Sequence, residues 1–226
     1  VLGCGYWGSN HIRTLKALGA LYAVSDANPA RAEGFASEQE CLAIAPDDLF
    51  SRDDIDAIVM ALPPQFHAET AIRAVESGKD VLVEKPVALT VADAERAVKA
   101  AHDHGRVYMV GHVLRFHPAF ETLKALIDKG ELGDVRYIHS HRLGLGKFHT
   151  ENDALWDLAP HDLSMILAIT GTEPLEVHGE GAAILDNLSD FAHLHMRFPH
   201  GLSGHLFASR LNPYRERRLT VVGTKA

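Results

Sequence analysis

The first half of the chain alternates short apolar runs with segments of helical periodicity. The apolar runs predict strands at 21–25, 56–61, 81–84 and 106–111. Between them, glycine and proline boundaries predict helices at 9–18, at 28–35, from Pro63-Pro64 to Ser77, and from a Thr90-x-x-Asp93 capping box to His104. Strands that alternate with helices favour a parallel, doubly wound α/β sheet.

The second half of the chain has a different rhythm. Helices are predicted at 118–129 and 160–170, followed by strands at 175–185, 191–198, 202–209 and 217–222. In 191–198, Leu194, Met196 and Phe198 alternate with His193, His195 and Arg197, which is typical of a mostly antiparallel sheet with one buried face. We therefore expect two domains, 1–112 and 113–226, and the short runs at both ends suggest that the chain is truncated.

Composition narrows the functional classes. The chain of 226 residues has 22 Lys plus Arg against 30 Asp plus Glu, a formal net charge of −8. An acidic chain without a basic run argues against a nucleic-acid partner. The apolar runs are too short to span a membrane. Two cysteines, Cys4 and Cys41, are expected to be buried and reduced, which favours a cytoplasmic protein.

A glycine pattern is the strongest local signal. Gly3-x-Gly5-x-x-Gly8 stands between a strand stub and a helix, where glycines allow a tight turn and a close backbone approach to a pyrophosphate. Asp26 closes the next strand, where an acid would bind a ribose 2′-hydroxyl. Asp26 would repel a 2′-phosphate and so favours NAD, whereas the nearby Arg31 keeps NADP open. The alternative is a glycine turn without a ligand.

A second signal is Glu84-Lys85-Pro86 at the carboxyl end of a predicted parallel strand. Open α/β sheets bind ligands at that edge, and Pro86 biases Lys85 away from a helical conformation. A lysine placed there would donate to a substrate hydroxyl and stabilise a developing alkoxide. The competing interpretation is an exposed charge in a turn.

A third signal is Asp157-x-x-x-His161 with Pro160 between the two residues. Pro160 suits the first position of a helix, which would place His161 in the first turn. The helix dipole would then keep the imidazole neutral, as a general base requires. Asp157, expected just before the helix, would orient that ring or hold a substrate hydroxyl. Alternatively, Asp157 only caps the helix and His161 is a solvated helix residue.

The remaining histidines are expected to be structural. His139 with His141, and His193 with His195, are i, i+2 pairs on predicted strands, so each pair shares a face. That pattern favours a polar sheet face or a subunit interface over a metal site, because no set of carboxylates and cysteines completes a coordination shell. We expect no metal. Cys4 has no partner base and is not expected to act as a nucleophile.

These motifs, in this order, resemble the Gfo/Idh/MocA oxidoreductase family. The resemblance runs along nearly the whole chain, through GCGYWG, VSD, ALPPQFH, VLVEKPVALT, VGHVLRFHPAF and WDLAPHDLSMI. It implies an N-terminal Rossmann domain, a C-terminal α/β domain with a large open sheet, and an NAD(P)-dependent dehydrogenase. The family's lysine, aspartate and histidine carry over to Lys85, Asp157 and His161, and either Lys85 or His161 is the base.

The resemblance also implies binding residues. Cofactor contacts are expected at Gly3, Gly5, Tyr6, Trp7, Gly8, Asp26, Leu62, Pro63, His67, Glu84, Lys85, Pro86 and Arg115. Substrate contacts are expected at Lys85, His112, Trp156, Asp157 and His161. His112 departs from the asparagine expected in that strand-end region.

The stretch from Arg136 to Asp162 looks like the branch of the family that acts on UDP-linked amino sugars. It implies oxidation at C3 of a UDP-N-acetylamino sugar and a homo-oligomer, dimer or tetramer, formed through the C-terminal sheet. Arg115, Arg136, Arg142 and Lys147 would face a diphosphate or be surface charges. The alternatives are a dehydrogenase of a free sugar or inositol, an NAD-dependent glycosidase, and a non-catalytic nucleotide sensor.

Overall fold

The computed structural model describes residues 1–146, 153–185 and 187–226 of the chain. These residues form two compact units, Val1–Gly111 and His112–Ala226. Both free cysteines lie in the first unit; Cys4 is buried as expected, but Cys41 is only partly buried.

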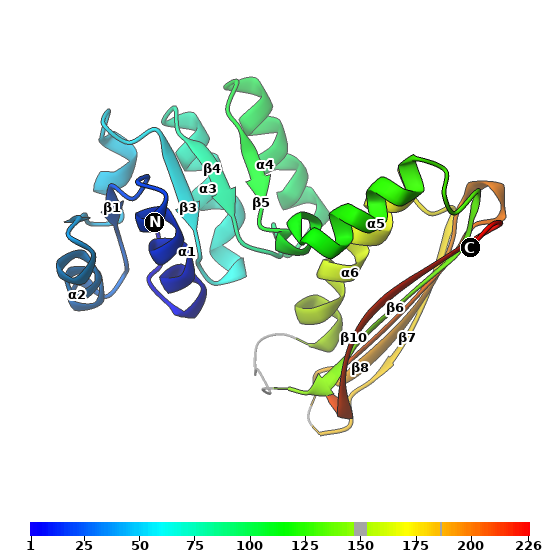
Figure 1. Ribbon diagram of the computed structural model, residues 1–226. Helices are drawn as coiled ribbons and strands as arrows, with labels where there is room; N and C mark the ends of the chain where they lie inside the picture. Colours follow the sequence, from blue (N-terminus) through cyan, green and yellow to red (C-terminus); the bar gives the residue numbers. More distant parts are fainter. Residues whose placement is uncertain (147–152, 186) are drawn as a thin grey trace. The chain divides into compact units, whose positions relative to one another are not determined.

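The first unit contains the alternating elements (Figure 1). In chain order they are α1 (Tyr6–Ala17), β1 (Ala23–Val24), α2 (Pro29–Gln39), β2 (Leu42–Ala43), η1 (Asp48–Ser51), β3 (Ala57–Met60), η2 (Pro64–Phe66), α3 (His67–Glu76), β4 (Asp80–Val83), α4 (Val91–Asp103) and β5 (Tyr108–Val110).

The strands of this unit make one parallel arrangement centred on the chain's second residue. Leu2 bridges Ser25 on one side and Met60 on the other, both in parallel. Because β1 pairs with β2, and β3 with β4 and then β5, the order is β2, β1, Leu2, β3, β4, β5. This is the strand order of a doubly wound Rossmann sheet, so the predicted fold class is confirmed.

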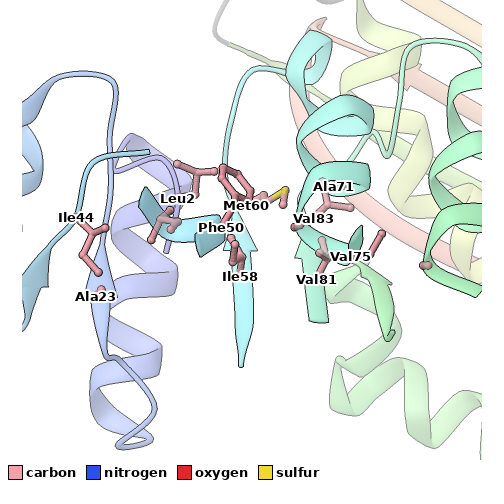
Figure 2. Packing of buried hydrophobic residues seen from close by; sticks show 13 residues of the cluster. Leu2, Ala23, Ile44, Phe50, Ile58, Met60, Ala71, Val75, Val81 and Val83 are labelled. Carbon is pink, nitrogen blue, oxygen red and sulfur yellow. The ribbon is translucent and has the colours of Figure 1, made fainter. Parts of the chain in front are cut away.

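The core of the first unit lies between this sheet and the helix that follows β3. Ala71 and Val75 of α3 face Val81 and Val83 of β4, and Met60 lies alongside (Figure 2). Alternate strand residues that are apolar and small helix residues allow the helix to pack closely on the sheet.

Local capping explains where the helices begin. Asn28 accepts a hydrogen bond from the backbone N–H of Arg31 before α2, and Thr90 accepts one from Asp93 before α4, which confirms the predicted capping box. α1 begins at Tyr6, earlier than the predicted Ser9, because the helix starts directly at the glycine turn.

The second unit is built around a five-stranded sheet. Its elements are η3 (Val113–Phe116), α5 (Pro118–Asp128), β6 (Val135–Leu145), α6 (Ala154–Thr170), β7 (Glu176–Ala182), β8 (Phe191–Arg197), η4 (Pro199–Gly201), β9 (Ser203–Ser209) and β10 (Leu211–Gly223). The strand order is β10-β6-β9-β8-β7. Only the β6–β9 pair is parallel among these neighbours, so the expected mostly antiparallel sheet is confirmed.

The two faces of this sheet differ. α6 packs on β9, β6 and β8 (Figure 1), and this face carries the buried core around Ile138, Met196 and Leu206. The opposite face, here called the histidine face, carries aromatic rings at 137, 139, 141, 193, 195, 205 and 207. The predicted alternation along β8 is therefore confirmed.

The prediction for α6 was wrong at its start. The helix begins at Ala154, capped by Asp153, whose carboxylate accepts from the backbone N–H of Trp156. Pro160 lies inside the helix, where it removes one backbone hydrogen bond. The strong cap at Asp153 and the apolar residues that α6 buries against the sheet offset that loss. β10 is also longer than the predicted 217–222.

Candidate functional site

The glycine turn of the first unit leaves open space at one position only among its three glycines. A Cβ on Gly3, whose φ is +93°, would lie 2.4 Å from the carbonyl oxygen of Ala61, and one on Gly8 would lie 1.8 Å from that of Gly3. A Cβ on Gly5 would meet no described atom within 4 Å beyond its neighbours in sequence. Gly3 and Gly8 are therefore required by packing, and Gly5 faces the space that a pyrophosphate would need.

The carboxylate of Asp26 is held beside this turn by backbone groups. Its Oδ2 accepts from the N–H of Cys4 at 2.7 Å, and its Oδ1 accepts from the N–H of Asn28 at 2.8 Å. The guanidinium of Arg31 lies 3.5 Å from Oδ1. An acid fixed in this way at the end of β1 suits the ribose hydroxyls of NAD. These residues fit the cofactor that the glycine pattern predicts.

His67 has a different role from the one expected. Its side chain is completely buried, and its ring nitrogens lie 2.7 Å from the carbonyl oxygen of Pro86 and 2.8 Å from that of Leu62. A fully buried ring has no surface to offer a cofactor. His67 instead joins the segment after β3 to the segment after β4. It thereby fixes Leu62, Pro63 and Pro86, which were expected to line the cofactor site.

Glu84 is held just ahead of the expected catalytic lysine. Its Oε1 accepts from Nε2 of His11 on α1 at 2.7 Å, and its Oε2 lies 3.3 Å from the backbone N–H of Lys85. Burial alone would raise the pKa of Glu84, but the hydrogen bond and charge of His11 lower it below its usual range. A Cβ on Gly111 would lie 3.2 Å from this carboxylate.

His11 is a residue that sequence analysis missed. It lies three positions after Gly8, so its helix carries both the glycine turn and the side chain that contacts Glu84. Nothing in the spacing of the motifs links positions 11 and 84, because the contact depends on how the fold brings α1 to the segment after β4. The glycine turn and the Glu84-Lys85-Pro86 segment are thus tied together, and the peptide between Lys85 and Pro86 is cis.

In the second unit, Asp157 and His161 lie on one continuous helix. Asp157 belongs to the first turn of α6, where a carboxylate is favoured by the helix dipole. His161 follows four residues later and is therefore a neighbour on the same helix face. His161 lies two turns inside α6 rather than at its start, so the predicted effect of the helix dipole on its ring was wrong.

Arg142 was expected to face a diphosphate or to be a surface charge, but it does neither. It is buried and forms an ion pair through Nε with Asp162, which also accepts a hydrogen bond from Ser140. Arg136 is exposed and pairs with Asp134 at 3.1 Å. Arg115 lies on η3 with its side chain exposed. Lys147 lies outside the described residues.

The remaining predicted residues lie at the edges of these features. Tyr6 and Trp7 form the first turn of α1 and are exposed, with ring centroids 6.0 Å apart. Trp156 is exposed in the first turn of α6, and His112 is half-buried directly before η3.

Two further findings concern metal binding and membrane-spanning helices. Among the described residues, no group of three or more His, Cys, Asp and Glu side chains is arranged to hold a metal ion. None of the described helices has the length and apolar character needed to cross a membrane.

The fold and the glycine turn define an NAD-binding oxidoreductase. The model for the oxidoreductase family with an NAD-binding Rossmann fold matches residues 1–112, and the model for the GFO/IDH/MocA C-terminal domain matches residues 120–226. The chain therefore belongs to the Gfo/Idh/MocA oxidoreductase family, as its motifs indicated.

Its relatives include enzymes named for two substrate classes. UDP-N-acetylglucosamine 3-dehydrogenase of Acidithiobacillus ferrooxidans is 31% identical over 222 residues, which cover 98% of this chain and 69% of the relative. The NAD(+)-dependent scyllo-inositol 2-dehydrogenase of Bacillus subtilis is 31% identical over 243 residues, covering 100% of this chain and 71% of the relative. A solved structure of UDP-N-acetylglucosamine 3-dehydrogenase GnnA from A. ferrooxidans has a TM-score of 0.90 at 31% identity, with 99% of this chain and 73% of that chain covered.

Proposed function

We propose that this protein is an NAD-dependent dehydrogenase that oxidises a secondary hydroxyl of a sugar. Lys85, Asp157 and His161 are its catalytic residues. The observation that carries the proposal is the pair of braces on the Lys85 segment: His11 holds Glu84 before it and His67 holds Pro86 after it. A lysine held from both sides at the carboxyl end of β4 has the fixed position that acid–base chemistry requires.

The geometry of the first unit supports the proposed cofactor residues. Gly5 gives a pyrophosphate room, and Asp26 receives the ribose hydroxyls. Leu62, Pro63 and Pro86 would border the nicotinamide, with Tyr6 and Trp7 beside the glycine turn. When bound, NAD⁺ supplies the acceptor for a hydride. NADP is disfavoured, because its 2′-phosphate would face the carboxylate of Asp26, although Arg31 offsets part of that repulsion.

The chain's own residues complete the reaction. His161 accepts the proton of the substrate hydroxyl, and Lys85 donates a hydrogen bond to the same oxygen. Asp157, one helical turn before His161, orients the imidazole or holds the sugar. The products are a ketone, a reduced cofactor and a proton left on His161. Lys85 and His161 exchange these roles if the lysine is the base.

The preferred substrate is a UDP-N-acetylamino sugar oxidised at C3. The relative with this named activity and the inositol dehydrogenase have the same identity to this chain, 31%. The choice is supported by the likeness of the 136–162 stretch to the nucleotide-sugar branch. Trp156 and His112 are proposed to border the sugar.

The test is reduction of NAD⁺ at 340 nm with UDP-N-acetylglucosamine, UDP-glucose, myo-inositol and free glucose. Lys85→Met and His161→Asn should each lower kcat by at least about a hundredfold. Arg13→Gln, an exposed α1 variant, serves as the control and should leave kcat unchanged. If both catalytic variants retain near-normal kcat on the best substrate, the proposal fails. Turnover of inositol alone would support the proposed reaction class but contradict the proposal that the substrate is a nucleotide sugar.

We also propose that a second copy covers the histidine face, giving a homodimer or a dimer of dimers in the cytoplasm. Burial and then the charges of His195, His193, His141 and His139 lower the pKa of His205 to about 4. A ring that stays neutral at neutral pH is less costly to bury at an interface. His205→Glu should shift the mass measured by analytical ultracentrifugation toward the monomer. A wild-type monomer would contradict this proposal.

A further inference from the structure

One row of the histidine face consists of histidines on four neighbouring strands. His178 of β7 is in register with His195 of β8, His195 with His205 of β9, and His205 with His139 of β6. Residues directly opposite one another on paired strands project from the same face of the sheet. The sheet therefore carries an unbroken row of imidazoles across β7, β8, β9 and β6, one on each strand.

The rings of this row lie close together. The ring centroids of His195 and His205 are 4.5 Å apart, and their Nδ1 atoms are separated by 3.3 Å. Two more histidines lie beside the row, His193 with its centroid 5.7 Å from that of His205 and His141 at 4.9 Å from His139. Imidazoles at these distances cannot all be protonated without repulsion between like charges.

With its imidazoles neutral, the histidine face is nearly balanced in charge. Glu176 pairs with Arg197 at 2.8 Å near one edge of the sheet, and Glu216 pairs with Arg218 at 2.9 Å near the other. A face whose charges balance suits a second copy of itself, because a two-fold interface brings the same groups against one another. The register places these charged and titratable groups on the face: Glu176, His178 and Glu180 on β7, His193, His195 and Arg197 on β8, His205 on β9, Tyr137, His139 and His141 on β6, and Glu216 and Arg218 on β10.

Protonation of the histidines would remove this balance. Within one copy, burial and then the charges of His141 and Arg218 lower the pKa of His139, against the opposing effect of Glu216. Burial and the neighbouring histidines lower the pKa of His205 in the same direction. A second copy would bury these rings further, so the associated state binds fewer protons than the separate copies. Association is therefore favoured above the pH at which the free histidines titrate and is lost as the pH falls through that range.

We propose that the histidine face is a proton-sensitive interface, at which two copies associate while the imidazoles are neutral and separate when the imidazoles are protonated. This inference rests on the proposed homodimer, since it assigns the regulation of that same interface. Each histidine of the face occurs twice between two copies, so protonation adds positive charge to both sides of the contact.

The experiment is sedimentation of the full chain at pH 7.5, 6.5 and 5.5, with and without EDTA. Circular dichroism at each pH shows whether the chain is folded; if it unfolds at pH 5.5, the comparison of pH 7.5 with pH 6.5 decides the result. We expect association at pH 7.5, a dissociation constant at least about tenfold higher at pH 5.5, and recovery on return to pH 7.5. One linked histidine per copy allows up to about a hundredfold per pH unit, because it counts twice in the dimer.

Substitutions within the row separate the histidines from other groups. His195→Lys places a fixed charge in the row and should dissociate the copies already at pH 7.5. His195→Gln combined with His205→Gln removes two titrating rings, so its dissociation constant should depend less on pH than that of the wild type. His102→Gln removes an exposed histidine from α4 in the other unit and should behave as the wild type does.

The outcomes distinguish this inference from the proposed homodimer. A monomer at pH 7.5 overturns both, whereas association that is unchanged at pH 5.5 overturns the inference alone. The inference also fails if the double glutamine variant keeps the full pH dependence of the wild type. Dissociation of the wild type by EDTA at pH 7.5 would mean that a metal ion bridges the copies, and would overturn it too. If the double variant does not associate at pH 7.5, His139→Gln, at the end of the row, is measured in its place.

Discussion

The two units place their polar groups by different means. In the first unit, the carboxylate of Asp26 is held by two backbone N–H groups, and the space beside it is created by glycines. In the second unit, the buried carboxylate of Asp162 is held by two side chains of β6, the guanidinium of Arg142 and the hydroxyl of Ser140. A site made by the backbone is stable against most side-chain changes, whereas one made by charge pairs depends on every member.

The largest effect should follow from breaking a pair in the second unit. Asp162→Asn leaves the guanidinium of Arg142 buried without a counter-charge, which should cost about 3–5 kcal/mol of unfolding free energy. Urea denaturation followed by circular dichroism measures it. Replacing both partners, as Asp162→Leu with Arg142→Met, should restore much of the loss. A single variant as stable as wild type would remove the contrast between the units.

The next largest effect should follow from a substitution in the glycine turn of the first unit. Gly8→Ala places a Cβ 1.8 Å from the carbonyl oxygen of Gly3, so we expect a loss of about 3 kcal/mol together with NAD binding. Gly5→Ala should retain the fold and lose NAD affinity, because its Cβ occupies only ligand space. Gly34→Ala, on α2 with no described atom near its Cβ position, should change neither. Equal NAD affinity in all three variants, by calorimetry, would contradict the assignment.

The position of Lys85 can be tested through its neighbour. Gly111→Ala places a methyl group 3.2 Å from the carboxylate of Glu84 and should displace it from His11. We expect kcat to fall about tenfold with little change in KM for NAD⁺. His11→Asn should have a similar effect, with a changed pH profile. A rise in the KM for NAD⁺ with kcat unchanged would instead mean that the contact between His11 and Glu84 serves cofactor binding alone.

The smallest expected effect concerns pH. The pKa of His205 is lowered from 6.5 to about 4, so the unfolded chain binds a proton between these values that the folded chain does not. Stability should therefore decrease as the pH falls from 6.5 to 4. His205→Gln should flatten this dependence, as measured by thermal unfolding across that range. If the stability of His205→Gln depends on pH as steeply as that of the wild type, then groups other than His205 cause the dependence.

The first unit was more predictable from the sequence than the second, because its polar groups are placed by the backbone. Gly3, Gly5, Gly8 and Asp26 form a local pattern whose backbone geometry allows few alternatives, so motif and structure agree. Pro160 illustrates the opposite case. A proline usually marks the start of a helix, but here Asp153 caps α6 earlier and burial against the sheet keeps the helix continuous.

Contacts between distant residues could not be predicted from sequence. Arg142 looked like a candidate ligand for a diphosphate, because nothing near it in sequence shows that Asp162 neutralises it. His11 and Glu84 meet only because the fold brings α1 to the segment after β4. The conformation of the backbone leaves a signal in glycine and proline positions, whereas the pairing of charges between elements that are distant in the chain leaves none.

We propose, as the central step of the reaction, that a hydride passes from a carbon of a nucleotide sugar to NAD⁺. The most direct measurement uses UDP-N-acetylglucosamine carrying deuterium at C3, with the reduced cofactor analysed by NMR. The account predicts a deuteron at C4 of the nicotinamide and a 3-keto sugar product. Reduced cofactor without deuterium, or reduction with inositol and none with the nucleotide sugar, would contradict it.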